Sequence, residues 1–405
     1  MNLDDYVWID KDARIMAKAN DEMTFYFKWS KDLKTDYMIL SRNYAESGIE
    51  ILKDIIEGSH NNIKYDIWFL PAVYLMRQSI ELILKAGLSE RGMCKKNLQD
   101  VFVEKKHNVI GLYNVFKLNS WVVNLSISEQ KWLEKYLNSI ETIDSNSDLF
   151  RYPFKDEFMK QYGNKSLDVL IMSNQLMYCY SILNKMLYGK WYENIIPNLN
   201  EDAQFLQLTD KNFYNCYLWD SPWSDGFYTQ IKGYSDVAEF LFHNFKNGKD
   251  EKYFYPIVFL MRNAIEIGLK RLFHLKMIEK VEKGEIIKSR KTHLLYKDLW
   301  KSIKPILIYY GEEDKQNPED IEIAEQYILS LDNIDKKGDT FRYPCSYSHE
   351  YKFNNNEVDV ENFYNYLLSL FHFIESCDSW LGVICDYENE MMSEYLSDVR
   401  SDWSI

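Results

Sequence analysis

Three charged residue types recur at the same helical spacing in two distant segments of the chain. They are Arg77, Glu81 and Lys85 in the first segment, and Arg262, Glu266 and Lys270 in the second. Positions i, i+4 and i+8 lie on one face of a helix, so each set predicts a charged stripe on an otherwise apolar helix. The stripes predict either an ion-pair ladder along the partly solvated edge of a core helix or, since buried ionic groups are costly and need a reason, a functional site.

The tetrapeptide Phe-Arg-Tyr-Pro also occurs twice. The copies lie at residues 150–153 and 341–344. Arginine captures carboxylate or phosphate groups with two parallel hydrogen bonds, which makes Arg151 and Arg342 candidate anion-binding residues. Alternatively, the aromatic side chains hold the loop on the core and a glutamate neutralises the arginine. In that case we expect Glu81 to pair with Arg151, and Glu266 to pair with Arg342.

The second copy of the tetrapeptide is followed by a histidine. Arg342 and His349 are separated by six residues, and the first copy has no histidine at the matching position. A histidine can act as general acid or base in phosphodiester cleavage, while an arginine stabilises the developing negative charge. Arg342 and His349 are therefore the candidate catalytic pair.

Two further histidines each end a basic segment. Residues 85–107 hold six Lys or Arg against three acids, and residues 270–293 hold eight against three. In a chain of net charge -14, such segments are candidate binding sites for an anionic ligand or an RNA backbone. His107 and His293 are accordingly candidate binding residues, although each could instead begin a helix beside a solvated loop.

Composition excludes several classes of protein. The 15 Gly and 8 Pro among 405 residues are too few for a turn-rich β-sandwich or propeller. The acidic balance disfavours broad binding to duplex DNA or anionic membranes, and no apolar run reaches the ~20 residues of a membrane span. Six scattered cysteines without a CxxC pair favour free thiols in a reducing cytoplasm. No secretion signal, metal motif or cofactor motif is visible, so we expect a cytoplasmic chain without metal or cofactor.

The chain repeats itself. Residues 70–85 and 255–270 are identical at nine of sixteen positions, and residues 136–153 and 327–344 at nine of eighteen. The features occur in the same order, with His107 and His293 at equivalent places. This pattern predicts two tandem related domains, residues 1–198 and 199–405, because the period is too long for a solenoid.

Each half has the pattern of a helical bundle. Apolar residues recur at helical spacing after Pro71 and Pro256, and alternating strand patterns are missing. Residues 167–190 and 358–384 predict long helices. We therefore expect an all-α fold with four or five helices in each half.

The motif order LMRxxIExxLK, a helix led by histidine (THLLYKDLW), FRYP and a long helix resembles the HEPN (higher eukaryotes and prokaryotes nucleotide-binding) superfamily. More narrowly, it is similar to uncharacterised bacterial HEPN-like proteins that carry FRYP. The resemblance covers roughly residues 65–190 and 250–385. It implies helical bundles that are usually dimeric, and hence a pseudo-dimer within this chain, with further homo-oligomers open. It also implies a metal-independent ribonuclease of toxin–antitoxin or phage-defence systems, or a nucleotide-binding or non-catalytic partner.

The catalytic signature of this superfamily is an arginine, four to six residues, and a histidine. Only Arg342 and His349 fit it. The resemblance implies that His349 is the general acid/base, that Arg342 binds phosphate, and that Glu266 and Lys270 orient them. The leading interpretation is a cytoplasmic bacterial protein that acts on RNA or a nucleotide in phage defence or a stress response. The alternatives are a non-catalytic nucleotide sensor, a partner of a toxin or antitoxin, and a structural scaffold.

Overall fold

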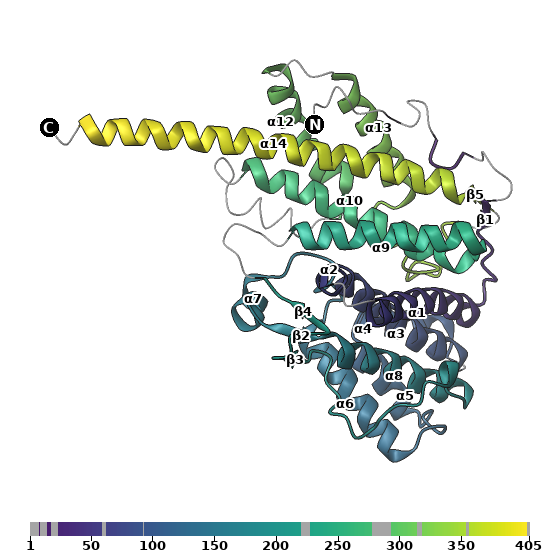
Figure 1. Ribbon diagram of the computed structural model, residues 1–405. Coiled ribbons are helices and arrows are strands. Elements are labelled where there is room, and N and C mark those ends of the chain that lie inside the picture. The colour runs from purple at the N-terminus through teal and green to yellow at the C-terminus, as the bar shows by residue number, and fades with distance from the viewer. Residues whose placement is uncertain are drawn as a thin grey trace. The chain divides into compact units, whose positions relative to one another are not determined.

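The computed structural model describes residues 8, 14–17, 23–58, 62–91, 93–219, 227–277, 293–313, 318–353 and 356–402. Helices account for 70% of the structure, with thirteen α-helices in the part described (Figure 1). The prediction of a mostly helical protein is therefore confirmed.

Two small sheets, which the all-α prediction missed, join distant segments. β1 (Thr24–Tyr26) pairs antiparallel with β5 (Glu357–Asp359), and β2 (Ser166–Asp168) lies between β3 (Leu208–Thr209) and β4 (Asn215–Tyr217). The all-α expectation is wrong in this respect. Strands of two or three residues are too short to produce an alternating pattern in the sequence.

The chain divides into two compact units. Unit 1 comprises Met1–Ala19, Ala264–Gly338 and Glu361–Ile405, and unit 2 comprises Asn20–Asn263 and Asp339–Val360. The chain passes from one unit to the other within α10 (Phe254–Met277). Each unit contains parts of both predicted halves, and the domain boundary between residues 198 and 199 stays a prediction.

Unit 2 is built around one buried helix. Its helices are α1 (Leu33–Glu57), α2 (Asn62–Ile67), α3 (Phe69–Glu90), α4 (Lys95–Lys105), α5 (Val109–Leu118), α6 (Ile127–Ile143), α7 (Asp156–Tyr162), α8 (Val169–Tyr188) and α9 (Phe227–Gly248), with short 3-10 turns at Tyr192–Asn194 and Glu251–Tyr253. Every residue of α3 from Phe69 to Leu88 is buried, because α1, α5, α8 and α9 all pack against it. A helix covered on all sides exposes no side chain to water, so the charged residues of α3 need partners inside the protein.

Unit 1 contains the end of α10, a π-helical turn η5 (Leu295–Trp300), α12 (Lys301–Glu313), α13 (Pro318–Ile334) and α14 (Val360–Asp402). Trp8 anchors the N-terminal segment in this unit. Its ring centroid lies 4.8 Å from that of Tyr327 and 5.3 Å from that of Phe373, and its indole N–H donates to Asp320 at 2.8 Å. Aromatic packing from three distant segments thus forms the core of unit 1.

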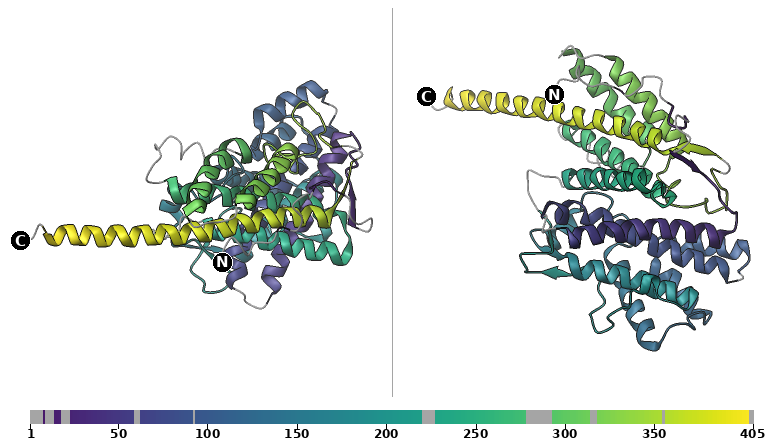
Figure 2. Two further views of the ribbon diagram at one scale, coloured as in Figure 1. Left: turned by 90° about the horizontal axis from the view of Figure 1, so that it is seen from above. Right: turned by 45° about the vertical axis from the view of Figure 1, so that its right-hand side comes forward.

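α14 is the longest helix, at 43 residues. Its C-terminal part carries exposed apolar side chains and extends beyond the other helices of unit 1 (Figure 2). Among the described residues, Val360–Leu396 is the one helical segment that is long and apolar enough to cross a membrane by length and composition. Core helices of soluble proteins can have the same length and composition. In the most apolar part of Val360–Leu396, 44% of the residues are buried. The expectation of no membrane-spanning segment stays a prediction.

Candidate functional site

Glu81 lies at the centre of a buried charged cluster in unit 2. Its carboxylate accepts hydrogen bonds from Arg77 Nη1 at 3.0 Å and Lys85 Nζ at 2.7 Å. The hydroxyl of Tyr343 donates to Glu81 Oε1 at 2.9 Å, and His107 Nδ1 lies 3.2 Å from Oε2. The stripe on α3 is therefore a buried ion-pair network and not a ladder at a partly solvated edge, and it includes His107, one of the three histidines that the sequence predicted.

Arg77 extends the network to the end of α6. Its Nη2 donates to the backbone carbonyl of His107 at 2.6 Å, and its Nε lies 3.5 Å from Asp144 Oδ2. Asp144 Oδ1 also accepts from the backbone N–H groups of Asp148 and Leu149. Our sequence interpretation missed Asp144. The signal was present, since the Ile-Asp pair at residues 143–144 recurs at 334–335 within the second repeated block.

Burial and charge set the protonation states in the cluster. Burial acts to raise the pKa of Glu81, but Lys85, His107 and Arg77 act against it and hold that pKa well below its usual range. Burial lowers the pKa of Lys85 and of His107, although Glu81 opposes both shifts. Glu81 is therefore ionised near neutral pH, and His107 is neutral.

The ring of His107 connects the buried cluster with solvent, since its side chain is 27% exposed. An ionised carboxylate only accepts hydrogen bonds, so Nδ1 of His107 carries the proton and donates to Glu81. Nε2 then keeps its lone pair. A neutral imidazole in a fixed orientation can accept a proton or a hydrogen bond from a ligand.

Unit 1 contains a similar arrangement of a glutamate, a lysine and a histidine. Buried Glu266 accepts from Lys270 Nζ at 2.9 Å, and His293 Nδ1 lies 2.9 Å from Glu266 Oε1. The side chain of His293 is 38% exposed. The basic stretch before it, residues 278–292, lies outside the described residues. Arg262, at the position equivalent to Arg77, is buried.

Arg151 and Arg342 are buried, and each contacts a helix from the other half of the sequence. Arg342 Nη2 donates to Gln78 Oε1 and Gln78 Nε2 donates to the Arg342 carbonyl, both at 3.2 Å. Asn263 Nδ2 donates to the Arg151 carbonyl at 3.0 Å, and Arg151 Nη2 donates to Asn263 Oδ1 at 3.5 Å. Gln78 and Asn263 occupy equivalent positions in the repeated sequences. The two arginines are therefore held by equivalent pairs of hydrogen bonds.

The aromatic surroundings of the two arginines follow the same pattern. Both guanidinium groups lie over the ring of Tyr74, at 5.8 Å for Arg151 and 5.7 Å for Arg342. Tyr74 stacks on Phe259, its equivalent in the repeat, with ring centroids 5.0 Å apart. Aromatic faces stabilise nearby cations, which adds to the amide hydrogen bonds.

These contacts correct the expected partner of Arg151. All hydrogen-bond and ion-pair partners of Glu81 among the described residues are accounted for by Arg77, Lys85, His107 and Tyr343, so the predicted Glu81–Arg151 pair is wrong. Arg342 hydrogen-bonds to Gln78 and Tyr343. Glu266 belongs to the other unit, so the Glu266–Arg342 pair stays a prediction. A side-chain amide suits this position because its oxygen accepts from the guanidinium while its nitrogen donates to the carbonyl of the loop.

The predicted catalytic pair is not gathered in one pocket. His349 lines a pocket of about 380 Å³ with Lys31, Leu33, Lys95 and Tyr351. Arg342 does not line this pocket; its guanidinium is buried against Gln78. The assignment of Arg342 and His349 as a catalytic pair stays a prediction.

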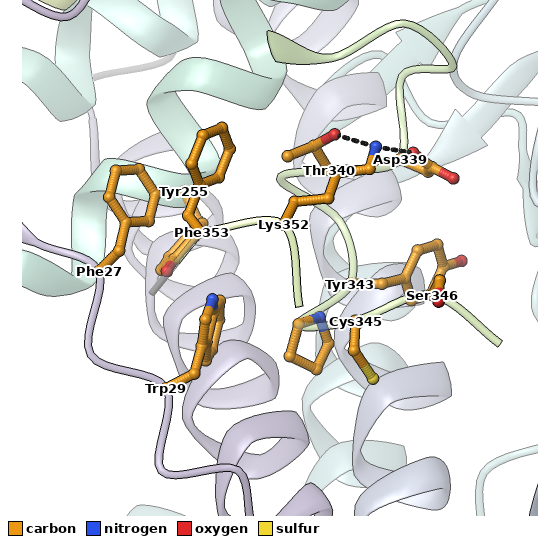
Figure 3. A pocket seen from close by; sticks show the side chains of 11 residues that line it. Phe27, Trp29, Tyr255, Asp339, Thr340, Tyr343, Cys345, Ser346, Lys352 and Phe353 are labelled. Atoms are coloured by element: carbon orange, nitrogen blue, oxygen red, sulfur yellow. Dashed lines mark hydrogen bonds and ion pairs between the residues drawn. The ribbon is translucent and has the colours of Figure 1, made fainter. Parts of the chain in front are cut away.

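A second pocket lies beside the Arg342 loop (Figure 3). Figure 3 shows the rings of Phe27, Trp29, Tyr255 and Phe353 near one another, and Lys352 bonded to Asp339 and Thr340. The pocket volume is about 40 Å³, enough for a few water molecules. Small-molecule sites usually measure at least ~300 Å³, so this pocket is too small for a nucleotide.

Among the residues that the structure describes, no group of three or more His, Cys, Asp or Glu side chains is placed to hold a metal ion. Comparison of the chain with protein-family models, with curated proteins and with solved structures finds no match. The resemblance to the HEPN superfamily therefore stays a prediction.

Proposed function

We propose that this chain is a HEPN-like protein that binds RNA or a nucleotide at His107 and His293. One observation carries the proposal: Nδ1 of each imidazole lies within hydrogen-bond distance of a buried glutamate, which orients the two rings at matching positions of the repeated segments. Apart from Lys85, which pairs with buried Glu81, the segment that ends at His107 (residues 86–107) adds five basic side chains against three acids. Such local positive charge supports contacts to phosphates in an acidic protein.

The same proposal includes an intramolecular pseudo-dimer of two related halves. The repeated sequences form α3 and α10, and each is followed by a glutamate-held histidine. The hydrogen bonds between Arg151 and Asn263, and between Arg342 and Gln78, support the pseudo-dimer further. Reciprocal contacts between equivalent residues are typical of two-fold interfaces. By resemblance, the setting is phage defence or a stress response in the bacterial cytoplasm, alone or with a toxin or antitoxin partner.

Metal-independent cleavage of RNA is the second candidate function. It is favoured by the glutamate–histidine pairs, since a carboxylate that fixes a neutral imidazole is a recurring general-base arrangement. The base would take the proton of a ribose 2′-hydroxyl, whose oxygen attacks the adjacent phosphorus. The bond to the 5′-oxygen breaks, that oxygen takes up a proton, and a 2′,3′-cyclic phosphate remains.

Binding and cleavage of a labelled single-stranded RNA in EDTA test both functions. We expect the His107→Ala/His293→Ala double variant to bind RNA at least about tenfold more weakly than wild type, because the contacts of both imidazoles with the ligand are lost. His243→Ala is the matched control, since His243 is exposed on α9. Unchanged binding by the double variant would refute the proposal.

Cleavage in the same assay separates the candidates. Wild-type cleavage that is lost in the double variant indicates a nuclease centred on His107 and His293. Binding without cleavage indicates a non-catalytic module. Cleavage lost only in His349→Ala would instead return the catalytic role to Arg342 and His349.

A further inference from the structure

The pocket that contains His349 has a basic lining. Lys31, Leu33, Lys95, His349 and Tyr351 form its wall, and its volume is about 380 Å³. This volume is within the range of small-molecule sites, ~300–1,000 Å³. The lining includes no carboxylate, so the wall favours an anionic ligand.

The basic groups of this pocket lack partners within the described structure. Neither Lys31 nor Lys95 forms an ion pair there, although many other lysines of this acidic chain do. Nε2 of His349 is buried and has no hydrogen-bond partner. Buried polar atoms in proteins are usually satisfied, so Nε2 of His349 is open to a hydrogen bond with a ligand or a water molecule.

The start of α4 adds positive potential. Lys95 is its first residue, and the N-cap residue Cys94 supplies no side-chain hydrogen bond to the first turn. The free N–H groups and the dipole at a helix N-terminus attract anions. By contrast, Asp32 caps the first turn of α1 by accepting from Thr35. The uncapped start of α4 therefore complements the two lysines.

The pocket wall is held in place by Asp36, which is buried in α1. Its carboxylate accepts from the backbone N–H of Lys31 at 3.0 Å and from the hydroxyl of Tyr351 at 2.8 Å. Ser30 donates to the same carboxylate through its N–H and its hydroxyl, both at 2.8 Å. Four hydrogen bonds thus engage this negative charge and fix two walls of the pocket before a ligand arrives.

We infer that this pocket binds a phosphate group of a small phosphorylated ligand through Lys31, Lys95 and His349. The source is either an inorganic phosphate species or the phosphate chain of a nucleotide. The site is distinct in its residues from the glutamate-held histidines, and the inference goes beyond the proposed function.

Calorimetric titration of the full chain with inorganic pyrophosphate and, separately, with ADP tests the inference. We expect Lys95→Ala to weaken pyrophosphate binding by about tenfold, because one charge-assisted contact is lost. Lys96→Ala is the matched control: it removes the same charge from the next, exposed position of α4, which does not line the pocket. We expect its affinity to stay close to that of wild type.

Two further variants avoid backbone strain. Lys31 and His349 have φ angles of 63° and 61°, in the left-handed region that asparagine tolerates better than alanine. Lys31→Asn and His349→Asn should therefore keep the loops and weaken pyrophosphate binding. A circular dichroism spectrum like that of wild type confirms that each variant is folded.

The outcomes are decisive in both directions. Equal affinity for pyrophosphate and ADP supports a site for the phosphate alone. Tighter binding of ADP shows that the nucleoside contributes to this pocket if Lys95→Ala weakens it and the His107→Ala/His293→Ala variant keeps it. Absence of binding to wild type, or equal losses in Lys95→Ala and Lys96→Ala, would overturn the inference. The His107→Ala/His293→Ala variant should keep pyrophosphate binding, which separates failure of the RNA proposal from failure of this one.

Discussion

At the scale of single residues, the buried carboxylate of Glu81 orders its surroundings. Arg77 and Lys85 neutralise it from the same helix, while Tyr343 and His107 reach it from distant segments. A complete buried ion pair adds little net stability, but a broken one is strongly destabilising. Glu81 is thus important both for the core and for the orientation of His107.

Replacement of Glu81 by glutamine tests how much the stability of the core depends on this carboxylate. The variant leaves Arg77 and Lys85 buried without their shared counter-ion, and we expect the free energy of unfolding to fall by about 3–5 kcal/mol. Urea denaturation of both proteins measures the difference. Glu134→Gln, which breaks the half-exposed pair with Lys117, should cost less than about 1 kcal/mol. Equal effects of the two substitutions would contradict a buried network.

The protonation of His107 should make stability depend on pH. Burial lowers the pKa of His107 from 6.5 in spite of Glu81. When the pH falls below 6.5, the unfolded chain binds a proton that the folded protein does not, so the free energy of unfolding should decrease towards the folded pKa. Urea titrations between about pH 7.5 and 5 measure this slope. The His107→Gln variant should lose this part of the pH dependence of the free energy of unfolding. An unchanged slope in that variant would mean that His107 is not its source.

At the scale of elements, two equivalent helix positions hold the two arginine loops. Gln78→Ala and Asn263→Ala each leave a buried guanidinium and a loop carbonyl without their amide partner. We expect each substitution to lower the free energy of unfolding by about 1–3 kcal/mol. Asn138→Ala, at an exposed position of α6, should change it by less than about 0.5 kcal/mol. Urea denaturation provides the comparison, and losses no larger than that of the control would mean that the amides do not anchor the loops.

Glycine at position 233 allows α9 to approach α2 closely. A Cβ atom there would lie 2.3 Å from the carbonyl oxygen of Ile67, whereas a Cβ at Gly382 in α14 would meet nothing within 4 Å. We expect Gly233→Ala to destabilise the protein by about 1–3 kcal/mol through overpacking. Gly382→Ala should stabilise it by up to about 1 kcal/mol through helix propensity. Thermal denaturation should therefore show shifts of opposite sign, and two upward shifts would contradict the close approach.

At the scale of the whole molecule, burial divides the six free cysteines. Cys94 is exposed and Cys385 half-buried, whereas Cys179, Cys216, Cys345 and Cys377 are buried. Burial also raises the pKa of the Cys345 thiol to about 11, which lowers its thiolate fraction. We expect a thiol reagent such as Ellman's to modify two cysteines in the native protein and all six in guanidinium without reductant. Fewer than six in the unfolded chain would reveal a disulfide.

The sequence by itself determined the features that depend on neighbours along the chain. Helical spacing of apolar residues predicted the mostly helical fold, because one face of each helix must be buried. The i, i+4 spacing gave pairing of Glu81 on its own helix as one of two alternatives, the other being Arg151, and the repeat matched His107 with His293. Strands of two or three residues produced no such signal, which is why both small sheets were missed.

Only the tertiary structure decided which distant segments meet. Tyr343 lies 262 residues from Glu81 along the chain, and Gln78 lies 264 from Arg342. The periodicity of apolar residues indicates that a helix face is buried, but it does not indicate which segment covers that face. The amide partners of the arginines and the basic pocket around His349 follow from packing between loops and helices that no local pattern relates, so they became visible only in three dimensions.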